Sequence, residues 1–296
     1  MIAVGGVCVT GIFRVKEVPS LPAKVLADAM CRIADGMAVS AACAFVQLGG
    51  TAAVWGRVGD DDDGAFASGS LAAAGLDVSS MRVVPGGRTS QATVVVDHTG
   101  RRLVVPFHDP GLDATTDWLP VDMIADAEIV HCDVRWPEAA EMALLAARRM
   151  GVPTMIDGDV APPAILRRLV PLADYAIFSD AGLRALTGLS DVPAGLHSVA
   201  DWHAGHVGAT CGADGYTWID EGTVRHEPSP RIEVVDTLAA GDVFHGAFAL
   251  AIVEGRSVKS AARFACTAAA LKCARFGGRL GCPTRADVDS LTCPSP

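Results

Sequence analysis

The sequence predicts an α/β fold in which a mostly parallel β-sheet lies between two layers of helices, with a small second β-sheet outside the main one. Three observations predict it. Short apolar segments alternate with alanine-rich segments of helical period along most of the 296 residues. Two other segments alternate with a period of two, which is typical of extended hairpins. Half of the residues are hydrophobic, which is enough for a large buried core.

The alternating part of the chain supplies the strands and helices of the main layers. The strands are predicted at Ile2–Cys8, Thr51–Arg57, Ala127–Cys132, Pro153–Asp157, Tyr175–Phe178 and His206–Cys211. The helices are predicted at Met37–Leu48, Asp63–Ala74, Pro137–Met150, Ala181–Leu186, Gly241–Glu254 and Val258–Phe276. Because a strand–helix–strand unit returns the chain across the sheet, the strands should be parallel and the helices should cover both faces.

Two extended segments interrupt this alternation and predict the small sheet. Phe13–Arg32 and Met81–Val105 each have the pattern of a hairpin, and the second turns at residues 98–100. A sheet outside the main layer could act as a lid. Near the end of the chain, antiparallel edge strands are predicted at Tyr216–Asp220, Thr223–His226 and Ile232–Val235. We therefore expect a single domain over residues 1–296, with a lid formed by about 12–34 and 81–108.

Composition and charge argue against several classes of function. The formal net charge of −10 argues against a nucleic-acid partner bound through its phosphates. The nine cysteines have neither zinc-site spacing nor an even number for a disulfide framework, as expected of free thiols in a reducing compartment. No segment is long and apolar enough for a membrane span, and glycines interrupt the N-terminal apolar run, unlike a signal peptide. We expect a cytoplasmic protein that binds a small molecule, with no nucleic-acid or membrane partner.

Glycine and aspartate gather where the predicted strands end. In open α/β sheets, ligands bind at the carboxyl ends of the strands. Gly59–Asp61, Asp133–Trp136, Asp157–Asp159 and Cys211–Gly215 all follow predicted strands at that edge. Turns between strands and helices favour the same residues in any protein. The pattern taken alone therefore leaves a ligand-binding edge and ordinary turns as equal alternatives.

The segment Asp236–Gly246 carries the sharpest chemical signal. It is a turn of small residues that opens into an apolar helix. Unpaired N–H groups at a helix start attract anions, and small side chains let a phosphate group approach them. Asp242 falls in the first turn, where a carboxylate can accept the proton of an attacking hydroxyl. Spacing alone favours a simpler interpretation, an acidic residue that complements the helix dipole.

Separated motifs resemble the signatures of the PfkB, or ribokinase-like, carbohydrate kinases. Asp236–Asp242 matches the pattern Asp-Thr-x-(Gly/Ala)-Ala-Gly-Asp, Gly56–Gly64 resembles the N-terminal signature, and Thr210–Gly215 resembles the nucleotide loop. The likeness covers almost the whole chain and implies a ribokinase-like three-layer α/β/α sandwich with a small β-sheet lid. Within the family, the sequence is most similar to the sulfofructose kinases, at Asp133–Trp136, Asp157–Asp159, Phe178–Ser179, Asp242–Gly246 and Ala270–Arg279.

The resemblance implies an ATP-dependent sugar kinase. Asp242 would be the general base, and the N–H groups of Ala239, Ala240, Gly241 and Asp242 would form an anion hole for the γ-phosphate. The implied nucleotide-binding residues are Thr210, Gly212, Gly215, Lys272, Gly277 and Gly278. Mg²⁺ would be held through ATP phosphates and water, with no direct protein ligand. The loop of Asp236 and Thr237 would be a candidate site for a monovalent cation such as K⁺.

The sugar side of the site is implied by a second set of residues. Lys24 and Arg135 match the cations that face the sulfonate in sulfofructose kinases, and two cations suit one anionic group. A lone Lys or Arg is more often a solvated surface residue. Thr10, Gly36 and Ser40 would complete the sugar-binding set.

Several positions depart from the family pattern. The chain contains no asparagine, so every family contact through an asparagine must be replaced. The sugar-binding aspartate of the family aligns with Phe13, which leaves Thr10 as the nearest polar residue, and two family asparagines align with Pro106 and Ser40. The phosphate-side motif Asn-x-x-Glu is replaced by residues 179–182. Because lost polar contacts change specificity strongly, we expect intact transfer machinery beside a remodelled sugar pocket.

Three functions stay open on these grounds. The first is phosphorylation of the primary hydroxyl of a sugar, such as a ketohexose that bears an anionic group, sulfofructose among them. The second is a nucleoside or other small-molecule kinase of the same superfold, in which Phe13 and Trp136 stack on a ring. The third is a catalytically silent protein that binds sugar and nucleotide. Lid sheets of this family often pair between subunits, which predicts a homodimer through the lid.

Overall fold

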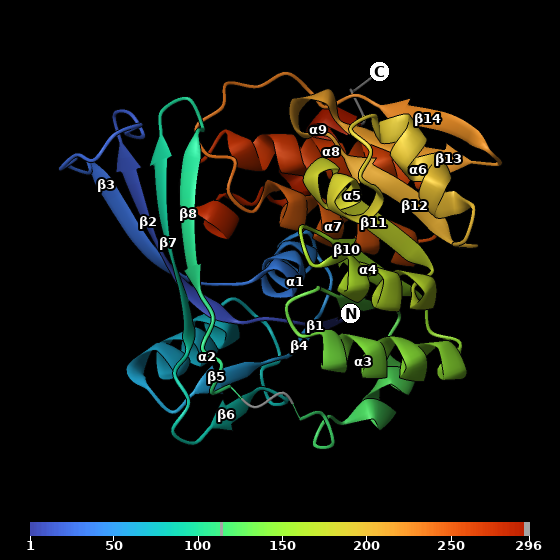
Figure 1. Cartoon of the computed structure of the whole chain (residues 1–296), viewed down its shortest axis with the longest axis horizontal. Coiled ribbons are helices and arrows are strands. Elements are labelled where there is room, and N and C mark those ends of the chain that lie inside the picture. The colour runs from blue at the N-terminus through green and yellow to red at the C-terminus, as the bar shows by residue number, and fades with distance from the viewer. Residues whose placement is uncertain (113–114, 293–296) are drawn as a thin grey trace.

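The computed structural model describes residues 1–112 and 115–292, in which a large sheet lies between two layers of helices and a small sheet stands beside them (Figure 1). The large sheet has the strand order β14-β13-β12-β11-β10-β9-β1-β4. Neighbours from β4 to β12 are parallel, and β13 and β14 are antiparallel to their neighbours. The strands are β1 Ile2–Val4, β4 Ala53–Trp55, β9 Val130–Cys132, β10 Thr154–Gly158, β11 Tyr175–Ser179, β12 His206–Thr210, β13 Tyr216–Asp220 and β14 Thr223–Glu227.

Helices cover both faces of this sheet because successive residues of each buried strand point in opposite directions. Ala3 of β1 packs into a core with α1, α7 and α8, whereas Ile2 and Val4 pack into a second core with α3 to α6. The helices are α1 Met37–Gln47, α2 Asp62–Ala73, α3 Pro137–Met150, α4 Pro163–Leu169, α5 Asp180–Thr187, α6 Val192–Ala200, α7 Ala240–Val253, α8 Val258–Cys273 and α9 Arg285–Thr292. The predicted three-layer α/β sandwich with a mostly parallel sheet is confirmed.

The small sheet has the order β3-β2-β7-β8, and β8 is one of its edges. Its strands are β2 Cys8–Val15, β3 Ala29–Asp35, β7 Ser90–Asp97 and β8 Arg102–Phe107. Each predicted hairpin supplies one antiparallel pair, and β2 and β7 join the two pairs in parallel. A third sheet of two short strands, β5 Arg57–Gly59 and β6 Arg82–Val84, lies near α2 (Figure 1).

Three strand predictions need correction. The segment Ile2–Cys8 is not one strand, because the chain leaves the large sheet at Gly5 and enters the small sheet at Cys8. A side chain at Gly5 would overlap the carboxylate of Asp133, so this close crossing requires glycine. Thr51–Arg57 is likewise divided between β4 and β5. Ile232–Val235 forms no strand, because it runs beside the turn of β7 and β8 near Gly100 instead of along β14.

Close packing of α7 on α1 sets the position of the first turn of α7. A β-carbon at Gly246 would lie 2.2 Å from the carbonyl oxygen of Ala41, so the two helices touch backbone to backbone at this point.

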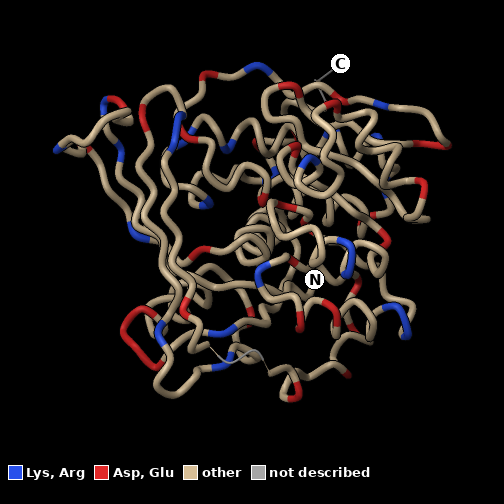
Figure 2. Tube along the Cα trace, viewed as in Figure 1, with Lys and Arg blue, Asp and Glu red and all other residues tan. Residues whose placement is uncertain are grey.

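Charged residues of both signs are spread over the loops and element ends (Figure 2). Within residues 1–112 and 115–292, none of the helices combines the length and hydropathy that crossing a membrane requires.

Candidate active site

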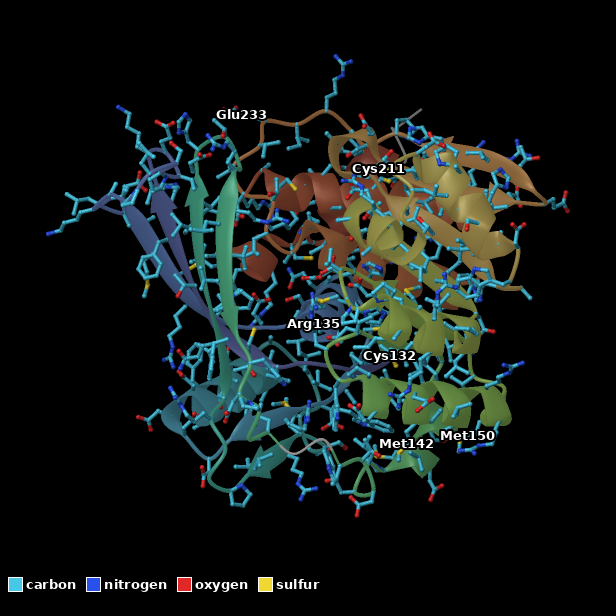
Figure 3. All side chains as sticks on the ribbon, in the orientation of Figure 1. Cys132, Arg135, Met142, Met150, Cys211 and Glu233 are labelled. Carbon is cyan, nitrogen blue, oxygen red and sulfur yellow. The ribbon has the colours of Figure 1, made fainter. Side chains whose placement is uncertain are left out.

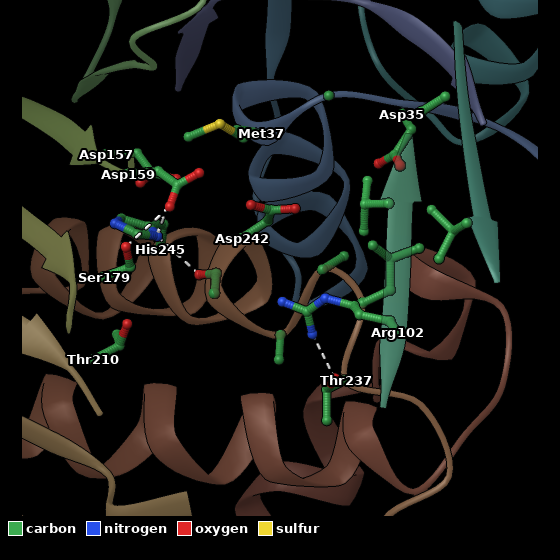
Figure 4. Close-up of a pocket in the computed structure, with 18 of the residues that line it drawn as sticks. Asp35, Met37, Arg102, Asp157, Asp159, Ser179, Thr210, Thr237, Asp242 and His245 are labelled. Carbon is green, nitrogen blue, oxygen red and sulfur yellow. Dashed lines mark hydrogen bonds and ion pairs between the residues drawn. The ribbon is translucent and has the colours of Figure 1, made fainter. Parts of the chain in front are cut away.

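A cavity of about 1,180 Å³ lies between the small sheet and the carboxyl ends of the parallel strands. Its wall is formed by β2, β7 and β8 on one side, and by the loops after β1, β9, β10, β11 and β12 on the other. The start of α7 enters the same cavity (Figure 4). A pocket at the carboxyl edge of a parallel sheet is the ligand-binding position expected of this architecture.

The turn before α7 brings small residues and the start of a helix to the cavity, and its Ala240 N–H group donates to the carbonyl oxygen of Thr237 at 3.3 Å. Ala239, the residue before the helix, adopts a left-handed conformation with φ of 61°. The four residues from Ala239 to Asp242 all line the cavity. The first turn of a helix leaves N–H groups without helical partners, and the helix dipole adds positive potential there. The small side chains leave this turn accessible, so the anion hole predicted there stays a prediction that the geometry permits.

Asp242 lies half-buried in the cavity wall beside other carboxylates. Burial raises its pKa well above the ordinary value, and the nearby charges of Asp157, Asp35, Asp159 and Asp133 raise it further. Figure 4 shows the Asp242 carboxylate between Asp35 on one side and Asp159 on the other. A carboxylate whose pKa is raised is a stronger base, so this residue is suited to accept a proton from a hydroxyl.

His245, one turn further along α7, fastens the helix start to the sheet. Its Nδ1 lies 2.8 Å from the carbonyl oxygen of Gly241, and its Nε2 lies 3.3 Å from that of Ile177 in β11. Carbonyl oxygens only accept hydrogen bonds, so the ring holds the helix start by donating an N–H group to a backbone carbonyl. Asp157 Oδ2 lies 3.6 Å from Nδ1, and burial raises the pKa of Asp157 to about 6. His245 therefore holds the turn in position, and it also lines the cavity.

Asp35 is a site residue that the sequence analysis missed. It ends β3, is only 9% exposed, and lines the cavity. Its carboxylate accepts hydrogen bonds from Thr10 Oγ1 at 2.9 Å and from Ser40 Oγ at 2.7 Å. Alignment had assigned the sugar-binding carboxylate to Phe13. A usable signal was present, because Asp35 lies between a predicted hairpin and the helix predicted to start after Gly36.

Gly36 makes the turn between Asp35 and α1. Its φ of 137° lies in the region that favours glycine, and a β-carbon there would lie 2.1 Å from the carbonyl oxygen of Gly6. Thr10, Gly36 and the Asp35 carboxylate line the cavity, whereas Ser40 is buried behind Asp35. The predicted sugar-side residues Thr10, Gly36 and Ser40 thus meet around a carboxylate that was not among them.

Arg135 lies near the middle of the molecule and lines the cavity (Figure 3). Its guanidinium donates to Asp159 Oδ2 at 3.0 Å and to the carbonyl oxygen of Val160 at 2.9 Å. Asp133, two residues earlier, is fully buried and accepts N–H groups of Gly6, Ala38 and Arg135. Asp133 therefore joins β1, α1 and β9, while Arg135 stays half-exposed and able to contact a ligand.

Two aromatic residues and one lysine from the sequence analysis lie elsewhere. Trp136 is buried, with the Arg57 guanidinium 4.0 Å from its ring centroid. Phe13 stands on β2 outside the described cavity wall, because it points to the other face of the strand from Thr10 and Ile12. Lys24 is exposed on the loop between β2 and β3, also outside that wall. The arrangement in which Phe13 and Trp136 stack on a ring is therefore wrong.

The inner face of the small sheet is mostly apolar, with one arginine. Ala92, Val94, Val104 and Pro106 line the cavity. Arg102, at the start of β8, reaches across and donates a hydrogen bond to Thr237 Oγ1 (Figure 4). Thr237 Oγ1 in turn donates to the carbonyl oxygen of Gly100 at 3.2 Å. The turn of the small sheet therefore contacts the loop that leads into α7.

The far end of the cavity carries part of the predicted nucleotide set. Thr210 and Gly212, after β12, line the wall, as do Ser179 and Asp180 after β11. The described lining leaves out Gly215, Lys272, Gly277 and Gly278. Direct nucleotide contact by these four was predicted from motif position, but three of them hold the loop at Asp236 from behind. Gly277 and Gly278 donate N–H groups to Asp236 Oδ2, and Lys272 donates to the carbonyl oxygen of Asp236.

Comparison with known proteins agrees with this arrangement. The family model for pfkB family carbohydrate kinases matches residues 6–285. Fructokinase-2 of Solanum lycopersicum is 26% identical over 312 residues, covering 95% of this chain and 94% of that protein.

Solved structures of the same fold cover both chains almost completely. A protein from Agrobacterium tumefaciens described as a candidate ribokinase superimposes with a TM-score of 0.94 at 41% identity, covering 98% of this chain and 96% of the other. Arabidopsis thaliana ribokinase, solved with ribose and ATP, superimposes with a TM-score of 0.83 at 24% identity, covering 99% and 98%. Together with the small-residue turn and the Asp242 carboxylate at the start of α7, these matches lead to one conclusion. The chain belongs to the pfkB family of carbohydrate kinases, ATP-dependent enzymes that transfer a phosphoryl group to a sugar.

Proposed function

We propose that this protein phosphorylates the primary hydroxyl of a ketohexose that bears an anionic group, with Asp242 as the general base. The observation that carries the proposal is the position of Asp242 in one cavity, between Asp35 on the sugar side and Thr210 with Ser179 on the nucleotide side (Figure 4). A base between the two substrates can reach the acceptor hydroxyl while the phosphoryl donor lies at the turn of α7.

The Asp35 carboxylate is suited to hold sugar hydroxyls. Thr10 and Ser40 orient it, because each donates one hydrogen bond to it. Its remaining lone pairs can accept two hydroxyl groups on neighbouring carbons of a sugar. The attacking hydroxyl would then lie toward Asp242.

The transfer step balances with the residues in place. Asp242 takes the proton of the hydroxyl, the oxygen forms a bond to the γ-phosphorus, and the bond from that phosphorus to the bridging oxygen of ADP breaks. The N–H groups of Ala239, Gly241 and Asp242 receive the negative charge that the γ-phosphoryl oxygens carry during transfer, whereas that of Ala240, predicted to join them, already donates to the carbonyl oxygen of Thr237. Phosphoryl transfer needs little covalent help from the protein, so positioning and electrostatics carry the rate.

Mg²⁺ fits the nucleotide side of the cavity. Asp159 accepts a hydrogen bond from Ser179 at 2.9 Å, and both line the wall with Asp180. These are oxygen ligands of the kind that Mg²⁺ and its bound waters prefer. The bound ion would neutralise charge on the phosphates of ATP, and Asp159 and Asp180 would orient its water ligands.

The position of Arg135 favours a sugar substrate that bears an anionic substituent. About half of its side chain is exposed, and it lines the cavity beside Gly6. Lys24, the second cation of the sulfosugar hypothesis, lies outside the described wall, so the sulfonate preference depends on Arg135. With Phe13 and Trp136 outside the cavity, no observation favours a nucleoside, and the intact turn at α7 argues against a silent binding protein.

A substrate panel tests the proposal. Purified protein is incubated with ATP, Mg²⁺ and, in turn, fructose, ribose, sulfofructose, a keto sugar acid and adenosine, and the release of ADP is measured. We expect kcat/KM for an anionic ketohexose to exceed that for fructose by roughly tenfold, the gain from one charge-assisted hydrogen bond. Arg135→Met should abolish this preference but not the turnover of fructose. Turnover of adenosine alone would overturn the proposal.

We also propose a homodimer formed through β8 of the small sheet. All six residues of this edge strand are exposed, and Leu103 and Val105 point away from the face that carries Arg102 and Val104. An open apolar edge offers unpaired backbone groups to a second copy. Light scattering should give twice the mass of one chain, and Val105→Lys should give the mass of one chain. A wild-type protein with the mass of one chain would contradict the proposal.

A further inference from the structure

Lys272 places a positive charge in the interior, directly behind the phosphate-binding turn. It lies in the last turn of α8, and its side chain is 0% exposed. The ammonium nitrogen donates to the carbonyl oxygen of Asp236 at 2.6 Å and lies 3.4 Å from Asp236 Oδ2. The Asp236 side chain is also 0% exposed. A buried carboxylate and a buried ammonium of this kind persist only as a pair, because either charge alone would be strongly destabilising.

The same carboxylate holds two chain segments together. Asp236 Oδ1 accepts the N–H group of Leu238 at 2.8 Å, and Oδ2 accepts those of Gly277 at 3.0 Å and Gly278 at 2.8 Å. The N–H group of Asp236 itself donates to the carbonyl oxygen of Cys273 at 3.1 Å. These hydrogen bonds therefore join the end of α8 to the loop before α7. The turn from Ala239 to Asp242 comes immediately after this loop in the chain.

The loop at Asp236 and Thr237 was a candidate site for a monovalent cation, and its residues do not fit one. The ammonium of Lys272 already takes the carbonyl oxygen and faces Oδ2 of Asp236. Thr237 Oγ1 accepts from Arg102 and donates to Gly100. A K⁺ ion bound to these oxygens would lie close to two fixed positive charges, which repel it in a poorly solvated position.

We propose that Lys272 is an internal substitute for a monovalent cation, so that phosphoryl transfer by this protein does not depend on K⁺. The inference rests on the proposed role of the α7 turn in binding the γ-phosphate. Lys272 acts there as a positioning residue. Its ammonium neutralises Asp236 and orients the peptide of Asp236 at the base of the turn, and without it an uncompensated carboxylate would lie behind the site of an anionic ligand.

The experiment compares the wild type with Lys272→Met, which keeps a similar shape but removes the charge. Lys259→Met is the matched control, because Lys259 lies exposed on the first turn of the same helix. Affinity for a non-hydrolysable ATP analogue with Mg²⁺ is measured by calorimetry in choline chloride and in KCl at equal ionic strength. Turnover of fructose is measured in the same two salts. Calorimetry with the ATP analogue needs no sugar. It therefore still tests the role of Lys272 if the proposed sugar proves not to be a substrate.

We expect the wild type and Lys259→Met to change less than about twofold between the two salts. Lys272→Met should bind the analogue roughly tenfold more weakly in choline chloride, as expected when a binding turn shifts by a fraction of an ångström. KCl should restore most of this loss, because the Met side chain ends one heavy atom earlier than Lys and leaves the position of the ammonium nitrogen, beside the oxygens of Asp236, free for K⁺.

Three results would overturn the inference. One is a wild type that KCl activates tenfold or more. The second is a Lys272→Met variant that matches the wild type in choline chloride. The third is a weakened Lys272→Met that KCl does not restore, which would show that Lys272 only fills space. Should Lys272→Met fail to fold, the salt response of the wild type decides, and Asp236→Asn combined with Lys272→Met removes both charges of the pair and tests whether nucleotide affinity then responds to K⁺.

Discussion

Replacing Asp242 by Asn is expected to lower kcat by about 10²- to 10⁴-fold, the range found when a general base is removed. The amide has nearly the same shape but cannot take the proton of the acceptor hydroxyl. Affinity for ATP should stay close to that of the wild type, because the N–H groups of the α7 turn are unchanged. ADP release and calorimetry with a non-hydrolysable analogue separate the two effects.

The control for this substitution is Asp62→Asn. Asp62 is exposed in the first turn of α2, so it complements a helix dipole without facing the cavity. Its kcat should be unchanged. If Asp242→Asn kept more than about a tenth of the wild-type kcat, Asp242 would be an ordinary first-turn residue, and the general-base mechanism would be wrong.

The raised pKa of Asp242 predicts the direction of the pH dependence. Burial and the nearby carboxylates favour its protonated form, so the basic form is present only above a pKa higher than that of an ordinary aspartate. In the wild type, kcat should therefore fall as the pH is lowered through this raised pKa, and the acid limb should be absent from the residual activity of Asp242→Asn.

Stability should respond in the opposite sense. The folded state binds this proton more tightly than the unfolded state, so ionisation of Asp242 destabilises the fold as the pH rises above the ordinary carboxyl pKa. Asp242→Asn removes that penalty, and its Tm at neutral pH should equal or exceed that of the wild type. A lower Tm would mean that the side chain holds the fold together.

Asp35→Ala is expected to reduce kcat/KM for the sugar by about 10²- to 10⁴-fold. Two hydrogen bonds from sugar hydroxyls to a carboxylate contribute about 1.5–3 kcal/mol each. Their loss removes that much binding in the transition state, and it also leaves Thr10 and Ser40 without their shared acceptor. The KM for ATP should change little, because Asp35 lies on the far side of Asp242 from Thr210 (Figure 4).

Two further variants make the Asp35 result specific. Ser40→Ala removes one of the groups that orient the carboxylate. It should lower kcat/KM for the sugar roughly tenfold, which corresponds to the loss of one such hydrogen bond. Asp126→Ala changes an exposed aspartate before β9 and should leave kcat/KM unchanged. Sugar kinetics of Asp35→Ala within threefold of the wild type would show that the sugar is held elsewhere in the cavity.

Local patterns were sufficient for the layers of the fold and for the phosphate-binding turn. Helical period and short apolar strands are properties of neighbouring residues, so the sequence predicted the main strands and helices to within a few residues. It overlooked α4, α6 and α9, which have only seven, nine and eight residues. The turn before α7 was also readable, because small residues followed by an apolar helix and an aspartate are contiguous in the chain.

The sugar side could not be predicted in the same way. Asp35, Thr10 and Ser40 come from β3, β2 and α1, and they meet only because β2 and β3 pair in the small sheet and Gly36 turns the chain sharply into α1. Alignment by chain position chose Phe13, which the two-residue period of β2 directs away from the cavity. Strand pairing across 25 residues decided which carboxylate entered the site.

By itself, therefore, the sequence predicted an α/β kinase fold, a helix start suited to a phosphate and a candidate base in its first turn, because each depends on residues that are adjacent in the chain. Only the tertiary structure decided that Asp35 enters the cavity, that Lys24 and Trp136 do not, and that Lys272 is an internal partner of Asp236. The physical reason is that charge and hydrogen-bonding capacity are properties of each side chain itself. The burial and direction of that side chain are set by packing between segments that are distant in the sequence.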